Sequence, residues 1–292
     1  MGDDIDGAAS AGKSVAILRA ALAEAGIDPA RSAAALRLPA ARGVAVAGHR
    51  AEVDFYPASV AKLPFLVAAH AWLEQRRLAP GAELDRALAA MIRDSSNDAA
   101  GHVVDCLTGT TSGPELAPAA LRRFLARRRA VNRYFRRAPW PGLAGCNLMH
   151  KTFADGPYGR DRQARSPEAG GGNRLTAGGV AELLWSMARH EAVTPARSTA
   201  MLALLERSLD PAERAAQPYN QVDGFLGAGL PAGSRLWSKA GWTSQTRHDA
   251  AIVRLPSRRW FVLVAFTEGR EAAADDRALP ALAAAIAQEV DR

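Results

Sequence analysis

The stretch FYPASVAKLPFL (residues 55–66) opens a run of apolar residues at helical spacing, which predicts a helix over residues 59–78. Ser59 and Lys62 stand three positions apart in it, so a helix sets their hydroxyl and amine about one turn apart on one face. A serine hydroxyl becomes a good nucleophile when a base takes its proton, and a lysine can be that base if burial and a nearby positive charge lower its pKa. The plainer interpretation is a serine near a helix N-terminus followed by a surface lysine.

Two further motifs follow in chain order. SSN (residues 95–97) lies in MIRDSSNDAAGHVVD, and KAG (residues 239–241) lies on a predicted strand in RLWSKAGWTS. With these three motifs the chain resembles the serine β-lactamase and penicillin-binding protein superfamily, most closely the class A β-lactamases. The resemblance extends over about residues 40–290 and includes the helix start NRLTAGGVAELL (residues 173–184).

The resemblance implies a division of roles in acyl transfer. Ser59 would attack the substrate carbonyl with Lys62 as its base, and Ser95 would relay a proton to the leaving nitrogen. Asn97 would donate to the substrate amide and contact Lys62. Lys239 would keep the local field positive, which helps to hold Lys62 neutral and attracts a substrate carboxylate.

The same resemblance implies the substrate-binding residues. The backbone amides of Ser59 and Trp242 would form the oxyanion hole. Gly241, Trp242 and Thr243 would line the substrate site. Arg247 is either a second contact for the carboxylate or a solvated arginine in a turn.

The chain departs from the class A pattern in its second and third motifs. Ser96 stands where these enzymes usually have Asp, and Ala240 stands where they have Thr or Ser. Loss of the hydroxyl at position 240 removes one hydrogen bond to a substrate carboxylate, worth on the order of 1 kcal/mol. We therefore expect weaker recognition of that carboxylate.

A third departure concerns the base that activates water in deacylation. The resemblance implies a glutamate four residues before an asparagine, and residues 156–176 contain no such pair. Glu168 and Asn173 are five apart, so Glu168 is only a weak candidate for this base. Asp155 and Asp161 are other carboxylates in reach by sequence, and a plain surface-loop carboxylate is the simpler interpretation of all three.

The predicted elements place strands near both ends of the chain with helices between them. This order predicts an α/β fold of the α+β type, with an antiparallel five-stranded sheet, flanking N- and C-terminal helices and an inserted all-helical domain, as in β-lactamases. We expect a sheet domain from residues 13–60 and 216–292, a helical domain over residues 61–215, and a flexible segment 1–12. The predicted strands cover residues 43–48 and 51–56, which we expect to form a hairpin, and residues 235–240, 249–255 and 260–267. The predicted helices cover residues 14–25, 59–78, 84–106, 121–137, 175–190, 194–209 and 277–290.

The positive charge of the chain belongs to one segment. The formal net charge is +7, and LRRFLARRRAVNRYFRR (residues 121–137) alone carries eight arginines, so the rest of the chain is about neutral. Aromatic residues among arginines could stack bases while the arginines hold phosphates. An amphipathic helix with solvated guanidinium groups is the interpretation we favour, because no nucleic-acid-binding motif accompanies the segment.

Other patterns carry less weight. GAASAGKS (residues 7–14) matches the phosphate-loop motif, but no buried strand precedes it, so we predict no phosphate site there. Cys106 and Cys146 show no metal-ligand spacing and allow at most one disulfide. We expect neither a metal nor a cofactor.

Location and partners are predicted as follows. No apolar run reaches the roughly 18 residues of a membrane span. The acidic N-terminus predicts a cytoplasmic protein, whereas the resemblance implies a periplasmic or secreted one, which would require translation to start upstream. We expect a monomer with a small-molecule substrate and no nucleic-acid partner.

These observations favour a serine hydrolase that forms an acyl-enzyme and hydrolyses β-lactams, with a role in β-lactam catabolism or antibiotic resistance. An esterase or a D-Ala-D-Ala peptidase could use the same motifs, because a fold does not determine its substrate. A different class of function is a non-catalytic binding protein that engages an anionic partner through its Arg-rich helix.

Overall fold

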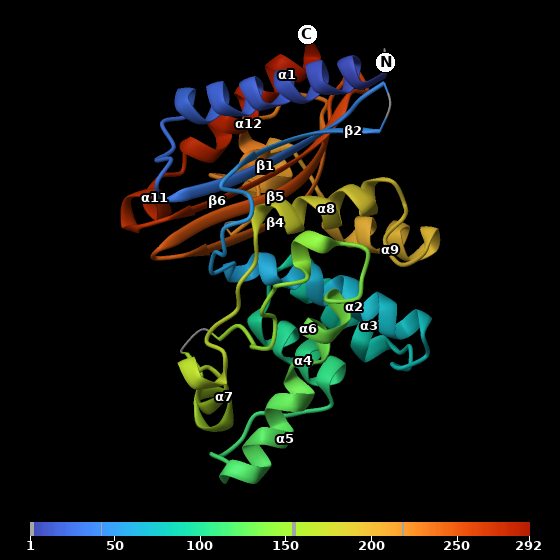
Figure 1. Cartoon of the computed structure of the whole chain (residues 1–292), viewed down its shortest axis with the longest axis vertical. Helices are drawn as coiled ribbons and strands as arrows, with labels where there is room; N and C mark the ends of the chain where they lie inside the picture. Colours follow the sequence, from blue (N-terminus) through green and yellow to red (C-terminus); the bar gives the residue numbers. More distant parts are fainter. Residues whose placement is uncertain (1–2, 42, 154–155, 218) are drawn as a thin grey trace.

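An antiparallel six-stranded sheet crosses the upper part of the molecule (Figure 1). The computed structural model describes residues 3–41, 43–153, 156–217 and 219–292, with the backbone alone for residues 3–11. The strand order is β2-β1-β6-β5-β4-β3. The strands are β1 (Ser32–Pro39), β2 (Val44–His49), β3 (Glu206–Arg207), β4 (Arg235–Thr243), β5 (Thr246–Arg254) and β6 (Trp260–Glu268).

Helices precede, interrupt and follow the strands. The α-helices are α1 (Asp3–Glu24), α2 (Lys62–Glu74), α3 (Ala82–Arg93), α4 (Asn97–Thr108), α5 (Pro118–Arg128), α6 (Ala130–Phe135), α7 (Gly159–Ala164), α8 (Ala177–Ala188), α9 (Pro195–Leu205), α10 (Pro211–Ala215), α11 (Arg270–Ala274) and α12 (Ala278–Asp291). Short 3-10 helices are η1 (Ala58–Ala61), η2 (Pro141–Leu143), η3 (Pro167–Ala169) and η4 (Leu226–Gly229).

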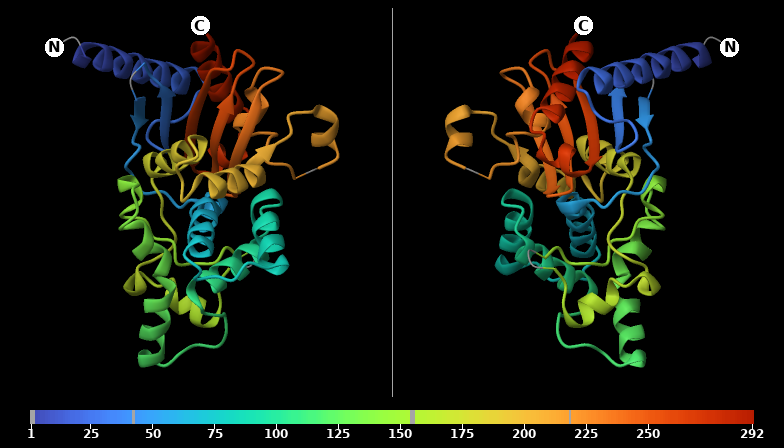
Figure 2. Two further views of the ribbon diagram at one scale, coloured as in Figure 1. Left: turned by 90° about the vertical axis from the view of Figure 1, so that its right-hand side faces the viewer. Right: turned by 90° about the vertical axis from the view of Figure 1, so that its left-hand side faces the viewer.

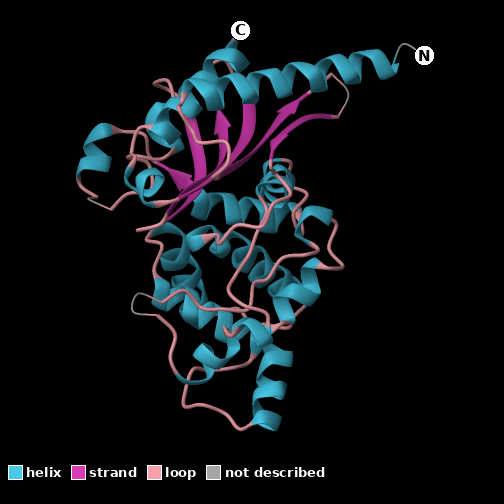
Figure 3. Cartoon of the chain, turned by 60° about the vertical axis from the view of Figure 1, so that its left-hand side comes forward, coloured by secondary structure: helices cyan, strands magenta, loops and turns pink. Residues whose placement is uncertain are grey.

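The sheet is the middle layer of three. Helices α1 and α12 pack together over one face, and α8 covers β1, β5 and β6 on the other (Figure 1). Helices α2 to α7 lie beneath the sheet and contain no sheet strand in their described residues (Figures 2 and 3), and one hydrophobic core joins α2, α3 and α4 to α8 and the sheet. Strand β1 pairs with β6, with Ser32 opposite Thr267, so the two ends of the chain complete one sheet.

The predicted fold class is confirmed, with differences in the sheet. The hairpin expected from residues 43–48 and 51–56 is wrong: β2 pairs instead with β1, and Phe55 makes only an isolated bridge to Leu175. Strand β1 reads SAAALRLP and is buried on both faces, so it lacks the alternation and the β-branched residues that mark a strand in sequence. The short β3 adds a sixth strand to the five expected, and it lies within the range 61–215 that we expected to be helical.

The helices also differ from expectation. The helix predicted over 194–209 ends at Leu205, before β3, and the short helices α7, α10 and α11 were not predicted. The helix predicted over 84–106 is broken between α3 and α4, and that predicted over 121–137 is broken between α5 and α6. Helix α1 begins at Asp3, so it takes in most of the segment 1–12 that we expected to be flexible, while residues 1–2 lie outside the described residues. GAASAGKS lies inside α1, where interior backbone amides bond within the helix and cannot wrap a phosphate.

Candidate active site

Ser59 lies in η1, directly before α2, with its hydroxyl oxygen 3.0 Å from Lys62 Nζ. The Lys62 side chain is fully buried although it opens α2. Burial disfavours the charged amine and lowers the pKa of Lys62 to about 7. A large fraction of this lysine is therefore neutral near pH 7, and a neutral amine has the free electron pair that a base needs.

Ser95 and Asn97 meet Lys62 because the chain breaks between α3 and α4. Ser95 has a φ of +52°, a left-handed conformation that costs energy for a residue with a side chain. Ser96 Oγ accepts from the Ala99 amide at 3.2 Å, so the residue that departs from the class A pattern is the N-cap of α4. Lys62 Nζ donates to the Ser95 carbonyl at 2.6 Å and to Asn97 Oδ1 at 2.9 Å.

The hydrogen bonds of Lys62 leave the electron pair of its neutral amine directed towards Ser59. Its two N–H groups are taken by the two carbonyl-type oxygens of Ser95 and Asn97, which can only accept. Its electron pair is then left for the Ser59 hydroxyl proton. The contacts therefore fit a base that takes the proton of Ser59.

Lys239 on β4 completes the cluster from the sheet side. Its amine is fully buried and donates to Ser95 Oγ at 2.9 Å and to the Ala240 carbonyl at 2.7 Å. Burial is the main cause that lowers its pKa, and the nearby charges of Lys62 and Arg207 add to it. Ser95 Oγ thus lies between two lysine amines, since Lys62 Nζ is 3.2 Å from it.

Strand β4 passes close to the backbone of the nucleophile at Gly241. A Cβ at this position would lie 3.0 Å from the amide nitrogens of Ser59 and Val60, so only glycine permits this approach. The Ala240 amide donates to Gln221, away from β5, and alternation along the strand points the Trp242 amide the same way. The two amides that the resemblance implies for an oxyanion hole, those of Ser59 and Trp242, therefore come from neighbouring segments.

A sequence model described as the β-lactamase enzyme family matches residues 41–290. The chain belongs to the β-lactamase enzyme family. It is a serine β-lactamase-like hydrolase by this assignment. A comparison with curated proteins finds no match.

Solved structures of β-lactamases and a penicillin-binding protein share the fold. A β-lactamase from Sphaerobacter thermophilus is 20% identical with a TM-score of 0.61, covering 93% of this chain and 94% of that one. A β-lactamase from Xanthomonas campestris is 19% identical with a TM-score of 0.65, covering 94% and 97%. A variant of PBP-A, described as an acyl-enzyme complex with penicillin G, is 16% identical with a TM-score of 0.66, covering 94% and 96%.

Two residues that sequence reasoning missed fasten the second motif of this β-lactamase family member to the third. Gln221 Oε1 accepts from Lys239 Nζ and from the Ala240 amide, and its Nε2 donates to the carbonyls of Ile92 and Arg93 at 2.9 and 2.8 Å. These carbonyls end α3, where a helix leaves its acceptors without intrahelical partners. An isolated glutamine in a loop carries no sequence pattern that could have indicated this role.

Arg207 on β3 provides a second link between the same two motifs. Its Nη2 donates to the Ile92 carbonyl at 2.7 Å and to the Ser238 carbonyl at 3.1 Å, so it joins the end of α3 to the residue before Lys239. Burial lowers its pKa to about 10, and the Asp249 carboxylate opposes that shift. Asp249 is itself fully buried, and burial raises its pKa to about 6.

The other predicted substrate-binding side chains lie at the β4–β5 hairpin. Trp242 is 57% exposed, so its indole is available to a ligand. Thr243 Oγ1 accepts from the Gln245 amide within the turn. Arg247 donates to the carbonyls of Gly224 and Ala273, both at 3.1 Å, so much of its guanidinium is already bonded to backbone rather than facing solvent.

The carboxylates proposed for deacylation are placed differently from one another. Glu168 in η3 is exposed, and hydrogen bonds within its own turn lower its pKa. Asp161 is buried and accepts from Arg128 at 2.8 Å, and Asp155 lies outside the described residues. Among the carboxylates that the structure describes, none is hydrogen-bonded to Ser59 or Lys62.

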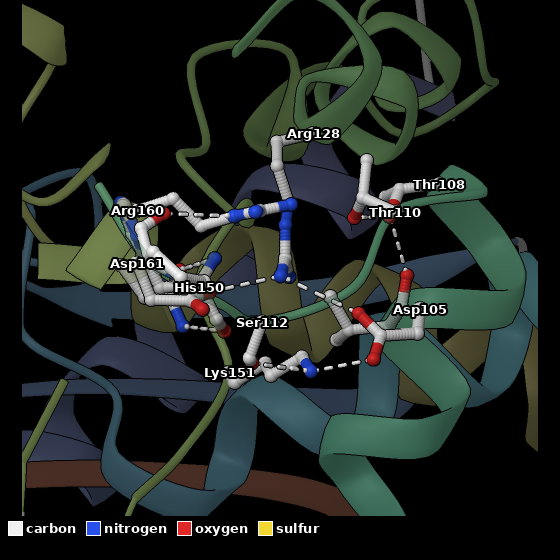
Figure 4. A network of polar contacts seen from close by, with 12 residues as sticks. Asp105, Thr108, Thr110, Ser112, Arg128, His150, Lys151, Arg160 and Asp161 are labelled. Carbon is white, nitrogen blue, oxygen red and sulfur yellow. Dashed lines mark hydrogen bonds and ion pairs between the residues drawn. The ribbon is translucent and has the colours of Figure 1, made fainter. Parts of the chain in front are cut away.

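Asp161 of α7 belongs to a buried ionic network that ties α7 to α4 and α5 (Figure 4). Arg128, from α5, is fully buried and points between Asp161 and Asp105 of α4, its Nη2 lying 2.8 and 3.4 Å from their carboxylates. Lys151 Nζ contacts Asp105 at 2.5 Å and donates to Ser112 at 2.9 Å. The one fully buried arginine of the Arg-rich segment is thus a structural anchor.

The expectations for metal ligands, cysteines and membrane spans can be compared with the described part of the chain. It contains no cluster of three or more candidate metal ligands. Cys106 and Cys146 are both free thiols, so the disulfide that their number allows does not form. Among the described helices, none is both long and apolar enough to cross a membrane.

Proposed function

We propose that this protein acylates itself at Ser59 with β-lactams and then hydrolyses the acyl-enzyme. The observation that carries the proposal is the 3.0 Å contact between Ser59 Oγ and the buried amine of Lys62, whose pKa burial lowers to about 7. Membership of the β-lactamase enzyme family supports the same reaction class.

In the acylation step, Lys62 Nζ takes the hydroxyl proton while Ser59 Oγ bonds to the carbonyl carbon of the lactam. The carbonyl electrons move onto its oxygen, and the amides of Ser59 and Trp242 donate to the oxyanion. When the carbonyl re-forms, the C–N bond breaks and the ring nitrogen leaves with the electron pair. The leaving nitrogen then needs a proton.

Ser95 is the group best placed to deliver that proton. Its hydroxyl lies 3.2 Å from Lys62 Nζ and 2.9 Å from Lys239 Nζ. The proton that Lys62 took from Ser59 can pass to Ser95 Oγ as the Ser95 proton passes to the nitrogen. Lys62 returns to the neutral form, and the charge in the buried site does not accumulate.

Deacylation in this proposal is slower than acylation. A water molecule that attacks the ester needs a base, and the described carboxylates provide none in contact with Ser59 or Lys62. Lys62 is neutral again after acylation and can take a proton from water, though less efficiently than a dedicated carboxylate held beside the water. The acyl-enzyme should therefore accumulate.

Esters and D-Ala-D-Ala peptides are alternative substrates of the same cluster. Both present a carbonyl to Ser59 and a leaving group to Ser95, so the chemistry of the cluster does not separate them from lactams. Arg207, which lies near Lys239 and stays charged because its pKa is about 10, favours a substrate with a carboxylate in all three cases.

Labelling with a fluorescent penicillin tests the proposal. Wild-type protein should become covalently labelled, Ser59→Ala should not, and Ser244→Ala, which changes an exposed serine in the β4–β5 turn, should label like wild type. If the penicillin does not label wild type, but wild type hydrolyses p-nitrophenyl acetate or a D-Ala-D-Ala peptide through Ser59, β-lactams are refuted as the substrate and the alternative substrates are supported. Labelling that survives in Ser59→Ala would refute Ser59 as the nucleophile.

A further inference from the structure

A second concave site lies away from the candidate active site, where the end of α2 meets α6. The cavity has a volume of about 480 Å³, and three arginines from two segments of the chain line it: Arg77, Arg133 and Arg137. Trp72 and Tyr134 form part of its wall. No residue of this cavity belongs to the Ser59 cluster, so a ligand bound there would not occupy the acyl-transfer site.

The charge of the cavity is not balanced by the protein. In the described part of the chain, none of its three arginines forms an ion pair with a carboxylate. Residues 116–154 contain neither Asp nor Glu, so the segment that supplies two of the three brings no counter-charge. Burial and the charge of Arg133 both lower the pKa of Arg77, which shows that the guanidinium groups are close enough to repel.

Two of the arginines are held in place before any ligand binds. The Arg77 guanidinium lies 3.8 Å from the centre of the Trp72 ring, and the Arg77 amide donates to the Trp72 carbonyl at 2.7 Å. Trp72 is fixed in turn by an edge contact with Tyr134, at 5.2 Å between ring centres. Arg133 Nη1 donates to the Ala126 carbonyl at 2.5 Å. These two side chains have therefore lost part of their conformational entropy before a ligand binds.

We propose that this cavity binds a compact anion with two linked phosphate groups. The positive charge of three guanidinium groups around one cavity exceeds the negative charge of a single carboxylate or phosphomonoester. The planar guanidinium group of arginine also matches the geometry of phosphate oxygens. The volume is in the range of small-molecule sites of about 300–1,000 Å³. An extended polyanion would also use the exposed arginines of α5, which do not line this cavity.

Isothermal titration calorimetry with inorganic pyrophosphate tests the proposal on the full chain. Wild type should bind at one saturable site, and Arg133→Gln with Arg137→Gln should weaken binding by at least about tenfold. The matched control is Arg122→Gln with Arg123→Gln, which removes the same charge from exposed positions of α5 outside the cavity. The control should bind within about twofold of wild type. Both double variants should keep the thermal unfolding midpoint and the penicillin labelling of wild type, because all four side chains are exposed.

Four results would overturn the proposal. The first two are no binding of pyrophosphate to wild type and equal weakening of its binding in both double variants. The third is tighter binding of citrate than of pyrophosphate. The fourth is binding of a long polyphosphate at several sites, with the α5 control weakening that binding as much as the cavity variant does. Equal weakening or multiple sites would indicate a diffuse basic surface in place of a defined cavity.

Discussion

At the scale of single residues, the reaction depends on Lys62 being neutral while it touches Ser59. Its pKa of about 7 predicts that the acylation rate rises with pH as the amine loses its proton, with half of the maximum near pH 7, and falls as the amine becomes protonated below that. Stopped-flow acylation by a chromogenic cephalosporin from about pH 5.5 to 8.5 measures this. A rate that does not change over that range would exclude Lys62 as a base with this pKa.

The burial of Lys62 also lowers the free energy of unfolding of the protein. Its pKa is about 7 when folded and near the ordinary value of 10.5 when unfolded, so the folded state is penalised fully below pH 7 and progressively less between those values. Lys62→Met should therefore raise the urea midpoint of unfolding at pH 6 and lose that gain as the pH approaches 10. The variant should also fail to acylate. A Lys62→Met protein that is less stable than wild type at pH 6 would contradict this account.

Gln221 is a positioning residue in this account. Gln221→Ala removes the acceptor of Lys239 Nζ and of the Ala240 amide, so we expect the acylation rate to fall about 10- to 100-fold, which corresponds to about 1.4–2.7 kcal/mol. Gln217→Ala, an exposed glutamine of the same loop, is the matched control and should acylate like wild type. Unchanged acylation in Gln221→Ala, with an unfolding midpoint like that of wild type, would show that Arg207 suffices to hold the two motifs together.

At the scale of elements, the Arg128 network holds α7 against α4 and α5. Arg128→Met leaves the buried carboxylate of Asp161 without its cation, so the free energy of unfolding should fall by about 3 kcal/mol or more. Arg128→Met with Asp161→Leu should recover part of that loss. Arg123→Met on the exposed part of α5 should change it by about 0.5 kcal/mol or less. Urea unfolding measures all three, and equal losses in the single and double variants would argue against a buried pair.

Sequence motifs allowed the catalytic residues of the candidate site to be predicted, whereas residues that act through contacts distant in the chain could not be predicted. Ser59, Lys62 and Lys239 were found because their spacing and the order of their segments carry chemical meaning. Strand β1 was missed because a central strand of alanines has no alternation to detect. Gln221 and Arg207 were missed because their roles depend on carbonyls more than a hundred residues away in the chain, which no local pattern records.

At the scale of the whole molecule, the candidate site lies where the sheet meets the helical body. Ser59 and Lys62 stand at the first helical turns below the sheet, Ser95 comes from the loop between α3 and α4, and Lys239 comes from β4. The cluster therefore exists only when both parts are folded and joined. We propose on this basis that the helices from α2 to α7 carry one wall of the site and the sheet, which includes β3 of the range 61–215, carries the other.

Intact-protein mass spectrometry tests the central claim most directly. Wild type and Ser59→Ala are mixed with a chromogenic cephalosporin, quenched at successive times, and weighed while absorbance follows ring opening. The account predicts an adduct in wild type that forms quickly, persists for many times its formation time and is absent from Ser59→Ala. Neither adduct nor ring opening in wild type, or both in equal measure in Ser59→Ala, would contradict it.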